Sequence, residues 1–311
     1  MSNILITGGA GNIGSALAEQ LSVNKNHTIV IVDNLLTGSL DKIPKYDTVK
    51  FINANINKYE DVVPIFGRYD FDYVFHFAAV VGVKRTLEHP ILVLNDIEGI
   101  KNVLSLSKNS GVKRVFYSSS SEVYGEPFEI PQNENTTPLN SRLPYAIVKN
   151  VGEAFFRSYQ KAYGLDYTIF RFFNTYGPHQ SEDFVIPRFI KAALKNEPIE
   201  IYGSGLQTRS FCYINDTIHA CVNTMLQDAY VNDVLNVGND KEITILELAR
   251  IIKRITHSSS DIIHLPALKE GDMKRRCPDI SKMKALLDRR LTTLDEGIIN
   301  LIHLHKEHST V

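Results

Sequence analysis

The chain has 311 residues, of which 43% are hydrophobic and 22% charged, and its 34 Lys and Arg residues are balanced by 35 Asp and Glu residues. This length suits about two domains or one large α/β domain, and the composition excludes a disordered chain. A formal charge of -1 gives no basic surface for nucleic acid or an anionic membrane.

Cysteine and histidine usage points to an intracellular protein without a metal site. Cys212, Cys221 and Cys277 form no CxxC pair, which predicts neither a disulfide framework nor a Cys-rich zinc site. The histidines show no HExxH spacing, so we predict no metal. The chain shows no leader sequence and no run of 18 apolar residues, and we therefore expect a cytoplasmic location without a membrane partner.

Short runs rich in β-branched residues alternate with helix-length segments through the first half of the chain. This alternation is typical of βαβ units on a parallel sheet. Several runs are apolar on both faces, as strands covered by helices on both sides are. We therefore predict a doubly wound parallel sheet, the Rossmann type of α/β fold. The predicted strands cover residues 4–6, 28–32, 49–52, 73–77, 115–117 and 167–170.

The alternation changes after residue 172. A helix is predicted over about 187–195, and strands are predicted over 199–202 and 234–237. We place a first domain at 1–172 and a smaller α/β region at 173–311, and we expect part of the latter, about 210–240, to pack back on the first sheet. Because no Pro- or Ser-rich linker separates them, the two parts should share a cleft.

A glycine-rich turn, TGGAGNIG, follows the first predicted strand and opens a helix. It satisfies GxGxxG through Gly9, Gly11 and Gly14, and GxxGxxG when Gly8 replaces Gly9. Such glycines let the backbone approach a pyrophosphate, which the helix N-terminus binds with oriented N–H groups. About 20 residues further on, Asp33 ends the second strand, where a carboxylate accepts ribose hydrogen bonds and repels a 2′-phosphate. The pattern predicts a dinucleotide site that favours NAD over NADP.

Two further positions lie where the rest of a dinucleotide passes in this fold. Asn55 ends the third predicted strand, and Ala78 and Ala79 follow the fourth. For Asn55, a simple turn cap remains the alternative.

A second group of polar residues follows the fifth predicted strand. Four serines, residues 118–121, end this strand, and Tyr145 and Lys149 come about 20 residues later at a spacing that places them on one helix face. A Lys ammonium beside a phenol favours the phenolate, so we expect a pKa of Tyr145 below its ordinary value of about 10. The apolar stripe of this helix is expected to lie beside the pair, at Val148, Val151, Phe155, Tyr159 and Ala162.

With these motifs, the chain resembles the extended short-chain dehydrogenase/reductases, the NAD-dependent nucleotide-sugar epimerases, dehydratases and decarboxylases. The resemblance covers nearly the whole length. The matching segments are 7–14, 33–38, 76–79, 118–125, 171–178, 202–210 and 275–279, with Asn95 and the Tyr145/Lys149 pair. The NAD contacts that it implies are Gly8, Gly11, Asn12, Ile13, Gly14, Asp33, Asn34, Thr37, Gly38, Asn55, Ile56, Phe77, Ala78, Ala79, Asn95, Ser118, Tyr145 and Lys149.

The same resemblance implies roles for the polar pair and the serines. Tyr145 would be the general base that removes a sugar hydroxyl proton, and Lys149 would tune it and hold the nicotinamide ribose. Ser120 would hydrogen-bond the reacting hydroxyl, because an alcohol that becomes a ketone needs a donor and acceptor beside it. A homodimer joined through the Tyr145 helix and the helix before it is also implied. Phe155, Phe156 and Tyr159 suit such an interface, and they would equally suit the core.

For the nucleotide sugar, the resemblance implies contacts in the second region. Asn174 would lie near the substrate diphosphate, Arg209 on its phosphates or ribose, and Tyr202 in the pocket for the base. Arg275 or Arg276 would be a second phosphate clamp, and its spacing to the end of the segment favours Arg276.

Glu122 bears on which reaction follows oxidation of the sugar. The 4,6-dehydratases carry an Asp-Glu pair where this chain has Ser121 and Glu122, which disfavours dehydration. Hexuronate decarboxylases carry Glu just before Val-Tyr-Gly, as here. Segments 76–79 and 83–90 are closer to the epimerases, and 143–149 departs from the decarboxylase form.

The sequence therefore predicts a UDP-hexose 4-epimerase first. A UDP-glucuronate decarboxylase that uses Glu122 is the alternative, and Lys84 and Arg85 would then contact a substrate carboxylate or form a solvated loop pair. A non-catalytic NAD-binding protein of the same fold is the third reading. The presence of both Ser120 and Tyr145 argues against it.

Overall fold

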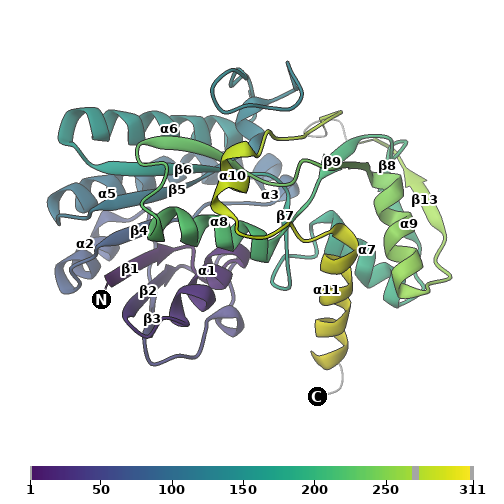
Figure 1. Cartoon of the computed structure of the whole chain (residues 1–311), viewed down its shortest axis with the longest axis horizontal. Coiled ribbons are helices and arrows are strands. Elements are labelled where there is room, and N and C mark those ends of the chain that lie inside the picture. Colours follow the sequence, from purple (N-terminus) through teal and green to yellow (C-terminus); the bar gives the residue numbers. More distant parts are fainter. Residues whose placement is uncertain (1, 268–272, 309–311) are drawn as a thin grey trace.

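A computed structural model of the chain describes residues 2–267 and 273–308, without the side chains of residues 83, 84 and 305–308. Seven strands form the central sheet in the order β11-β6-β5-β4-β1-β2-β3, and every neighbouring pair is parallel (Figure 1). This is the doubly wound fold that the sequence predicts. The strands are Ser2–Thr7 (β1), His27–Asp33 (β2), Val49–Asn53 (β3), Tyr73–His76 (β4), Arg114–Ser120 (β5), Asp166–Phe172 (β6) and Asp233–Val237 (β11).

Helices cover both faces of the sheet. Along β1, Ile4 and Ile6 pack toward helices α1 (Asn12–Ser22) and α8 (Ile214–Leu226). Leu5 points the other way, because side chains alternate along a strand. It packs in a second core with the helices of the opposite face, α2 (Tyr59–Arg68), α5 (Asp96–Asn109) and α6 (Pro144–Tyr163).

The right-hand part of the molecule in Figure 1 contains β8 (Ile199–Tyr202), β9 (Thr208–Ser210), β13 (Ile262–Leu265), α7 (Val185–Leu194), α9 (Ile245–Thr256) and α11 (Leu294–His308). Strand β8 pairs with β13, and β9 pairs with β12 (Glu242–Thr244). The predicted strand over 199–202 is confirmed. The other elements are η1 (Leu40–Lys42), α3 (Val83–Glu88), α4 (Pro90–Leu94), η2 (Ser121–Tyr124), β7 (Thr175–Tyr176), β10 (Cys212–Tyr213) and α10 (Ser281–Leu286).

Two elements from the second half of the chain join the first sheet. Strand β11 extends the sheet beside β6, and α8 packs against α1. Among residues 2–267 and 273–308, no helix has the length and apolarity that a membrane crossing needs.

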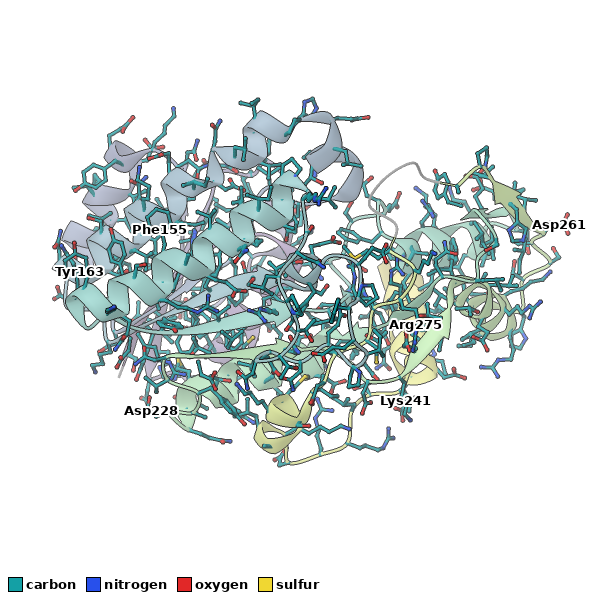
Figure 2. The ribbon with its side chains drawn as sticks, turned by 90° about the horizontal axis from the view of Figure 1, so that it is seen from above. Phe155, Tyr163, Asp228, Lys241, Asp261 and Arg275 are labelled. Carbon is teal, nitrogen blue, oxygen red and sulfur yellow. The ribbon has the colours of Figure 1, made fainter. Side chains whose placement is uncertain are left out.

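Helix α6 buries a different face from the one predicted. Its buried residues are Ala146, Val148, Lys149, Gly152, Glu153 and Phe156, whereas Phe155 and Tyr159 are only half-buried and Ala162 is exposed. The helix packs closely on β5 at Gly152, where a Cβ would overlap the Tyr117 hydroxyl. Lys149 therefore belongs to the buried face instead of bordering it. Figure 2 marks Phe155 and Tyr163 along this helix.

Candidate functional site

A cavity of about 700 Å³ opens where β1, β4 and β5 end. In open α/β sheets, ligands bind outside the carboxyl ends of the strands, and ligand cavities commonly have this size. The residues of the sequence prediction that line it are Gly8, Gly11, Asn12, Ile13, Gly14, Asp33, Asn34, Thr37, Asn55, Ile56, Phe77, Ala78, Ala79, Asn95, Ser118, Ser120, Glu122, Tyr145, Lys149, Asn174 and Arg276.

The glycine-rich turn is shaped for a pyrophosphate. Gly8 has a φ of +71°, and a Cβ on it would lie 2.6 Å from the Ala78 backbone nitrogen. Around Gly11 the space is open apart from one backbone oxygen, and no side chain caps the N-terminus of α1. The buried Oδ1 of Asn12 has no hydrogen-bond partner among the described residues. This arrangement fits a bound phosphate group, which would take the free N–H groups of the helix.

Asp33 is fixed by the backbone on both sides. Its Oδ1 accepts a hydrogen bond from Leu35 N (2.8 Å), and its Oδ2 accepts one from Ala10 N (3.0 Å). The predicted contact Gly38 does not line the cavity. It packs behind this loop, where a Cβ would lie 2.8 Å from Ala10 Cβ and 3.0 Å from Asp33 Oδ1. A residue with a side chain would not fit here, so Gly38 supports the Asp33 loop from behind.

Lys149 and Tyr145 both face the cavity, but their electrostatics differ from the prediction. The Lys149 Nζ donates hydrogen bonds to Ser118 O (2.6 Å) and Ser118 Oγ (3.3 Å), and lies 5.7 Å from the centre of the Tyr145 ring. Burial lowers the pKa of Lys149 to about 8. Burial also raises the pKa of Tyr145 above its ordinary value, and a hydrogen bond with Ser120 acts in the opposite direction. The protein environment alone therefore does not lower the pKa of Tyr145.

Glu122 and Arg276 form an ion pair within this cavity. The Arg276 Nη1 lies 2.9 Å from Glu122 Oε1, and only 6% and 19% of the two side chains are exposed. Arg276 also donates to Ser121 Oγ (3.4 Å). The buried atoms Glu122 Oε2 and Arg276 Nε have no hydrogen-bond partner among the described residues. The sequence did not predict that these two residues meet, and unpaired buried polar atoms at a cavity are available to a ligand.

Three predicted substrate contacts lie outside the residues that line the cavity. Tyr202, at the end of β8, lies under the guanidinium of Arg188 at 5.2 Å, and the buried Arg209 donates to Thr208 O (2.7 Å). Arg275 is half exposed and pairs with Glu242 at 2.5 Å; Figure 2 shows it near Lys241. Neighbouring residues of an extended segment point to opposite sides, which separates Arg275 from Arg276. The side chain of Lys84 lies outside the described residues.

The structure also adds cavity residues that the sequence reasoning missed. Lys42 crosses from the first domain to donate to His179 O (3.0 Å). Asp96 accepts from Val80 N (2.7 Å) and Asn57 Nδ2 (3.2 Å), and its burial raises its pKa. The only signal for Asp96 in the sequence is its place beside Asn95.

Comparisons with known proteins identify the family of the chain. The model of the NAD-dependent epimerase/dehydratase family matches residues 4–238. The chain belongs to this family. Its cofactor is therefore NAD, and the glycine turn and Asp33 fit that group.

The relatives of this chain are named for different activities. A UDP-N-acetyl-α-D-glucosaminuronate decarboxylase of Bacillus cytotoxicus is 38% identical, over 91% of this chain and 90% of that protein. The crystal structure of the Thermotoga maritima UDP-glucose 4-epimerase with UDP-glucose has a TM-score of 0.93 and 30% identity, over 99% of both chains. The Thermus thermophilus UDP-glucose 4-epimerase with NAD has a TM-score of 0.90 and 27% identity, over 98% of this chain and 99% of that one.

Proposed function

We propose that this protein is an NAD-dependent decarboxylase of a UDP-hexuronate, acting through a 4-keto sugar. The observation that carries the proposal is the Glu122–Arg276 ion pair in the same cavity as Ser120 and Tyr145. An epimerase needs only Tyr145 and Ser120, because its 4-keto sugar rotates in the site and takes the hydride back on the other face. An epimerase would use Arg276 only as the phosphate clamp that the sequence predicts, and the reaction itself would give the buried Glu122 carboxylate no part. The Bacillus relative, named for a hexuronate decarboxylation, supports the proposal.

NAD would be held by the glycine turn, Asp33 and Lys149, and when bound it accepts a hydride from the sugar and later returns it. Tyr145 takes the hydroxyl proton in the oxidation and gives it back at the end. Ser120 is hydrogen-bonded to Tyr145, and its Oγ accepts from Glu122 N at 3.2 Å, which fixes the Ser120 side chain toward the reacting hydroxyl. Because burial raises the pKa of Tyr145, its phenolate depends on nearby positive charge, which Lys149 contributes.

Arg276 and Glu122 would act on the sugar carboxylate. Once the neighbouring hydroxyl is a ketone, the bond to the carboxylate carbon can break, carbon dioxide leaves, and the electron pair moves onto the ketone oxygen as an enolate. A proton added at the ring carbon then restores the ketone. Arg276 is suited to hold the carboxylate through paired hydrogen bonds. Glu122, which shares Arg276, places a like charge beside that carboxylate and favours its loss as a neutral molecule.

The test supplies UDP-glucuronate and UDP-N-acetylglucosaminuronate, each labelled at the carboxyl carbon, and traps the carbon dioxide. The wild type should release label and form the corresponding UDP-pentose. Glu122→Gln removes this like charge and should lower the rate about 100-fold, since a close like-charge pair is worth several kcal/mol and about 1.4 kcal/mol corresponds to tenfold. Glu126→Gln, an exposed residue after the same turn, should stay within about twofold, as surface changes do.

A UDP-hexose 4-epimerase is the second candidate, favoured by the full-length similarity to the Thermotoga maritima enzyme. Interconversion of UDP-glucose and UDP-galactose without carbon dioxide release would establish it and reject the decarboxylase. If the wild type converts none of these substrates faster than Tyr145→Phe does, both enzymes are rejected. The protein is then the third alternative, a non-catalytic NAD-binding protein.

We also propose a cytoplasmic homodimer joined through α5 and α6. Phe155 and Tyr159 are half-buried in the single chain and suit such an interface, whereas Phe156 is fully buried and belongs to the core, which was the alternative for these residues. Sedimentation velocity of the wild type against Phe155→Glu measures the association.

A further inference from the structure

Four buried polar side chains connect the segments that carry the site residues. We call Glu153, Arg171, Tyr124 and Asn236 the buried network; their exposed fractions are 0%, 2%, 0% and 0%. They come from α6, β6, η2 and β11, four elements that are distant in the sequence. Burying such groups is costly unless each is hydrogen-bonded, and here all four are.

The first part of the network joins the helix of Tyr145 to the strand that ends at Ser120. Glu153 lies one helical turn after Lys149. Its Oε1 accepts hydrogen bonds from Ser119 Oγ (2.7 Å) and Arg171 Nε (2.8 Å), and its Oε2 accepts one from Arg171 Nη2 (2.7 Å). This paired geometry is the strong, directional form of an Arg–carboxylate contact.

The middle of the network is the Tyr124 hydroxyl. It accepts a hydrogen bond from Arg171 Nη1 (2.8 Å) and donates one to Asn236 Oδ1 (2.7 Å). Tyr124 lies two residues after Glu122 in the same short helix, η2. The Tyr124 hydroxyl therefore links η2, the short helix that contains Glu122, to both β6 and β11.

The last part reaches the segment of Arg276. Asn236 Nδ2 donates to Gln132 O (2.9 Å) and Asp279 O (3.2 Å). Gln132 N in turn donates to Cys277 O (2.8 Å), and Asp279 N donates to Gln132 O (2.8 Å). The residues directly after Arg276 are thus held by Asn236 and by the strand-like bridge at Gln132.

We propose that the buried network positions Arg276 against Glu122 and so controls the step that follows oxidation of the sugar. Its members are positioning residues, because none of the four lines the cavity. That this step is the loss of carbon dioxide rests on the function proposed above. A network that only stabilised the fold would not need to join the Glu122 turn and the Arg276 segment through one hydroxyl.

The test uses the complete protein with NAD and compares Tyr124→Phe with Tyr230→Phe. Tyr124→Phe removes only the hydroxyl that joins Arg171 to Asn236. Tyr230→Phe is the matched control, because it likewise removes a hydroxyl that donates one hydrogen bond, here to the backbone oxygen of Lys282 (3.1 Å) and away from the cavity.

For Tyr124→Phe, we expect kcat for carbon dioxide release to fall about 10- to 100-fold, the effect of misplacing a group by about 1 Å. KM should change less than kcat and the 4-keto hexuronate should accumulate, because Tyr145 and Ser120, the residues that serve the oxidation, stay in place. Amide exchange in a peptide covering residues 277–280 should rise roughly threefold to tenfold, the effect of losing one hydrogen bond. Tyr230→Phe should change neither quantity.

The two readouts separate the possible failures. Unchanged exchange in Tyr124→Phe, or faster exchange with unchanged kcat, overturns the positioning role. A wild type that releases no carbon dioxide rejects the decarboxylase, while the exchange comparison still decides whether Tyr124 holds the Arg276 segment. If Tyr124→Phe does not fold, Asn236→Asp, which removes both amide donors, must give the same exchange result or the inference fails.

Discussion

Replacing Lys149 by Met removes a buried amine from α6 and measures how strongly burial opposes its charged form. Lys149 is 3% exposed, and burial lowers its pKa from 10.5 to about 8. Between these values, the unfolded chain binds a proton that the folded protein does not. The free energy of unfolding therefore falls as the pH drops from 10.5 to 8, and the contribution is fully lost below the folded-state pKa.

The size of the effect follows from the shift, since one pKa unit is about 1.4 kcal/mol. Between pH 10 and pH 7, the wild type should lose about 2.5 kcal/mol of unfolding free energy relative to Lys149→Met. The hydrogen bonds from Lys149 to Ser118 are absent from the variant at both pH values. Their loss lowers the unfolding free energy of Lys149→Met by the same amount at both pH values. The test is therefore how the difference between the wild type and the variant changes with pH.

The assay is urea unfolding of nucleotide-free protein at pH 7 and pH 10, followed by circular dichroism. Other titrating groups cancel in the difference between the wild type and Lys149→Met. Lys161→Met, at an exposed position of the same helix, should run parallel to the wild type. A difference between wild type and Lys149→Met that stays constant within about 0.5 kcal/mol, the usual scatter of surface substitutions, would refute the reasoning.

Three further predictions test the cavity and its packing. Tyr145→Phe should retain NAD but lower turnover about 100- to 10,000-fold, the range for a lost general base, as measured by product formation and nucleotide content. Asp33→Asn removes the charge that repels a 2′-phosphate, so the preference for NAD over NADP should fall about tenfold in fluorescence titrations. Gly152→Ala should lower the free energy of unfolding by about 1–3 kcal/mol, because its Cβ would overlap the Tyr117 hydroxyl; Gly67→Ala, with open space around it in α2, should not.

The elements that carry a strong local signal could be predicted from the sequence. The strands show as β-branched runs because both of their faces are buried, and the structure confirms all six predicted in the first half. The glycine turn is equally local, since the glycine spacing and the start of α1 directly after it can both be read from one short segment, although the approach of Gly8 to Ala78 is a long-range contact. The i, i+4 spacing of Tyr145 and Lys149 likewise brings both to one cavity.

The features that failed prediction depend on how distant segments pack. The buried face of α6 is set by the approach of Gly152 to Tyr117 and by the pairing of Glu153 with Arg171, neither of which appears in the periodicity of apolar residues. The contact between Glu122 and Arg276 likewise depends on the place of β11 in the sheet and on the bridge near Gln132. No local pattern encodes such a meeting.

The charges of the cavity bear on which substrate the proposed activities would take. Arg276 is paired with Glu122, and burial lowers the pKa of Lys149, whereas Lys42 and Arg85 donate to the backbone oxygens of His179 and Val81. An anionic group placed beside Glu122 must take Arg276 over from that carboxylate, and it then gains the paired hydrogen bonds of the guanidinium. A neutral hexose leaves the ion pair intact. The two proposed activities thus differ in whether the substrate competes with Glu122 for Arg276, which is also the contact that the buried network holds in place.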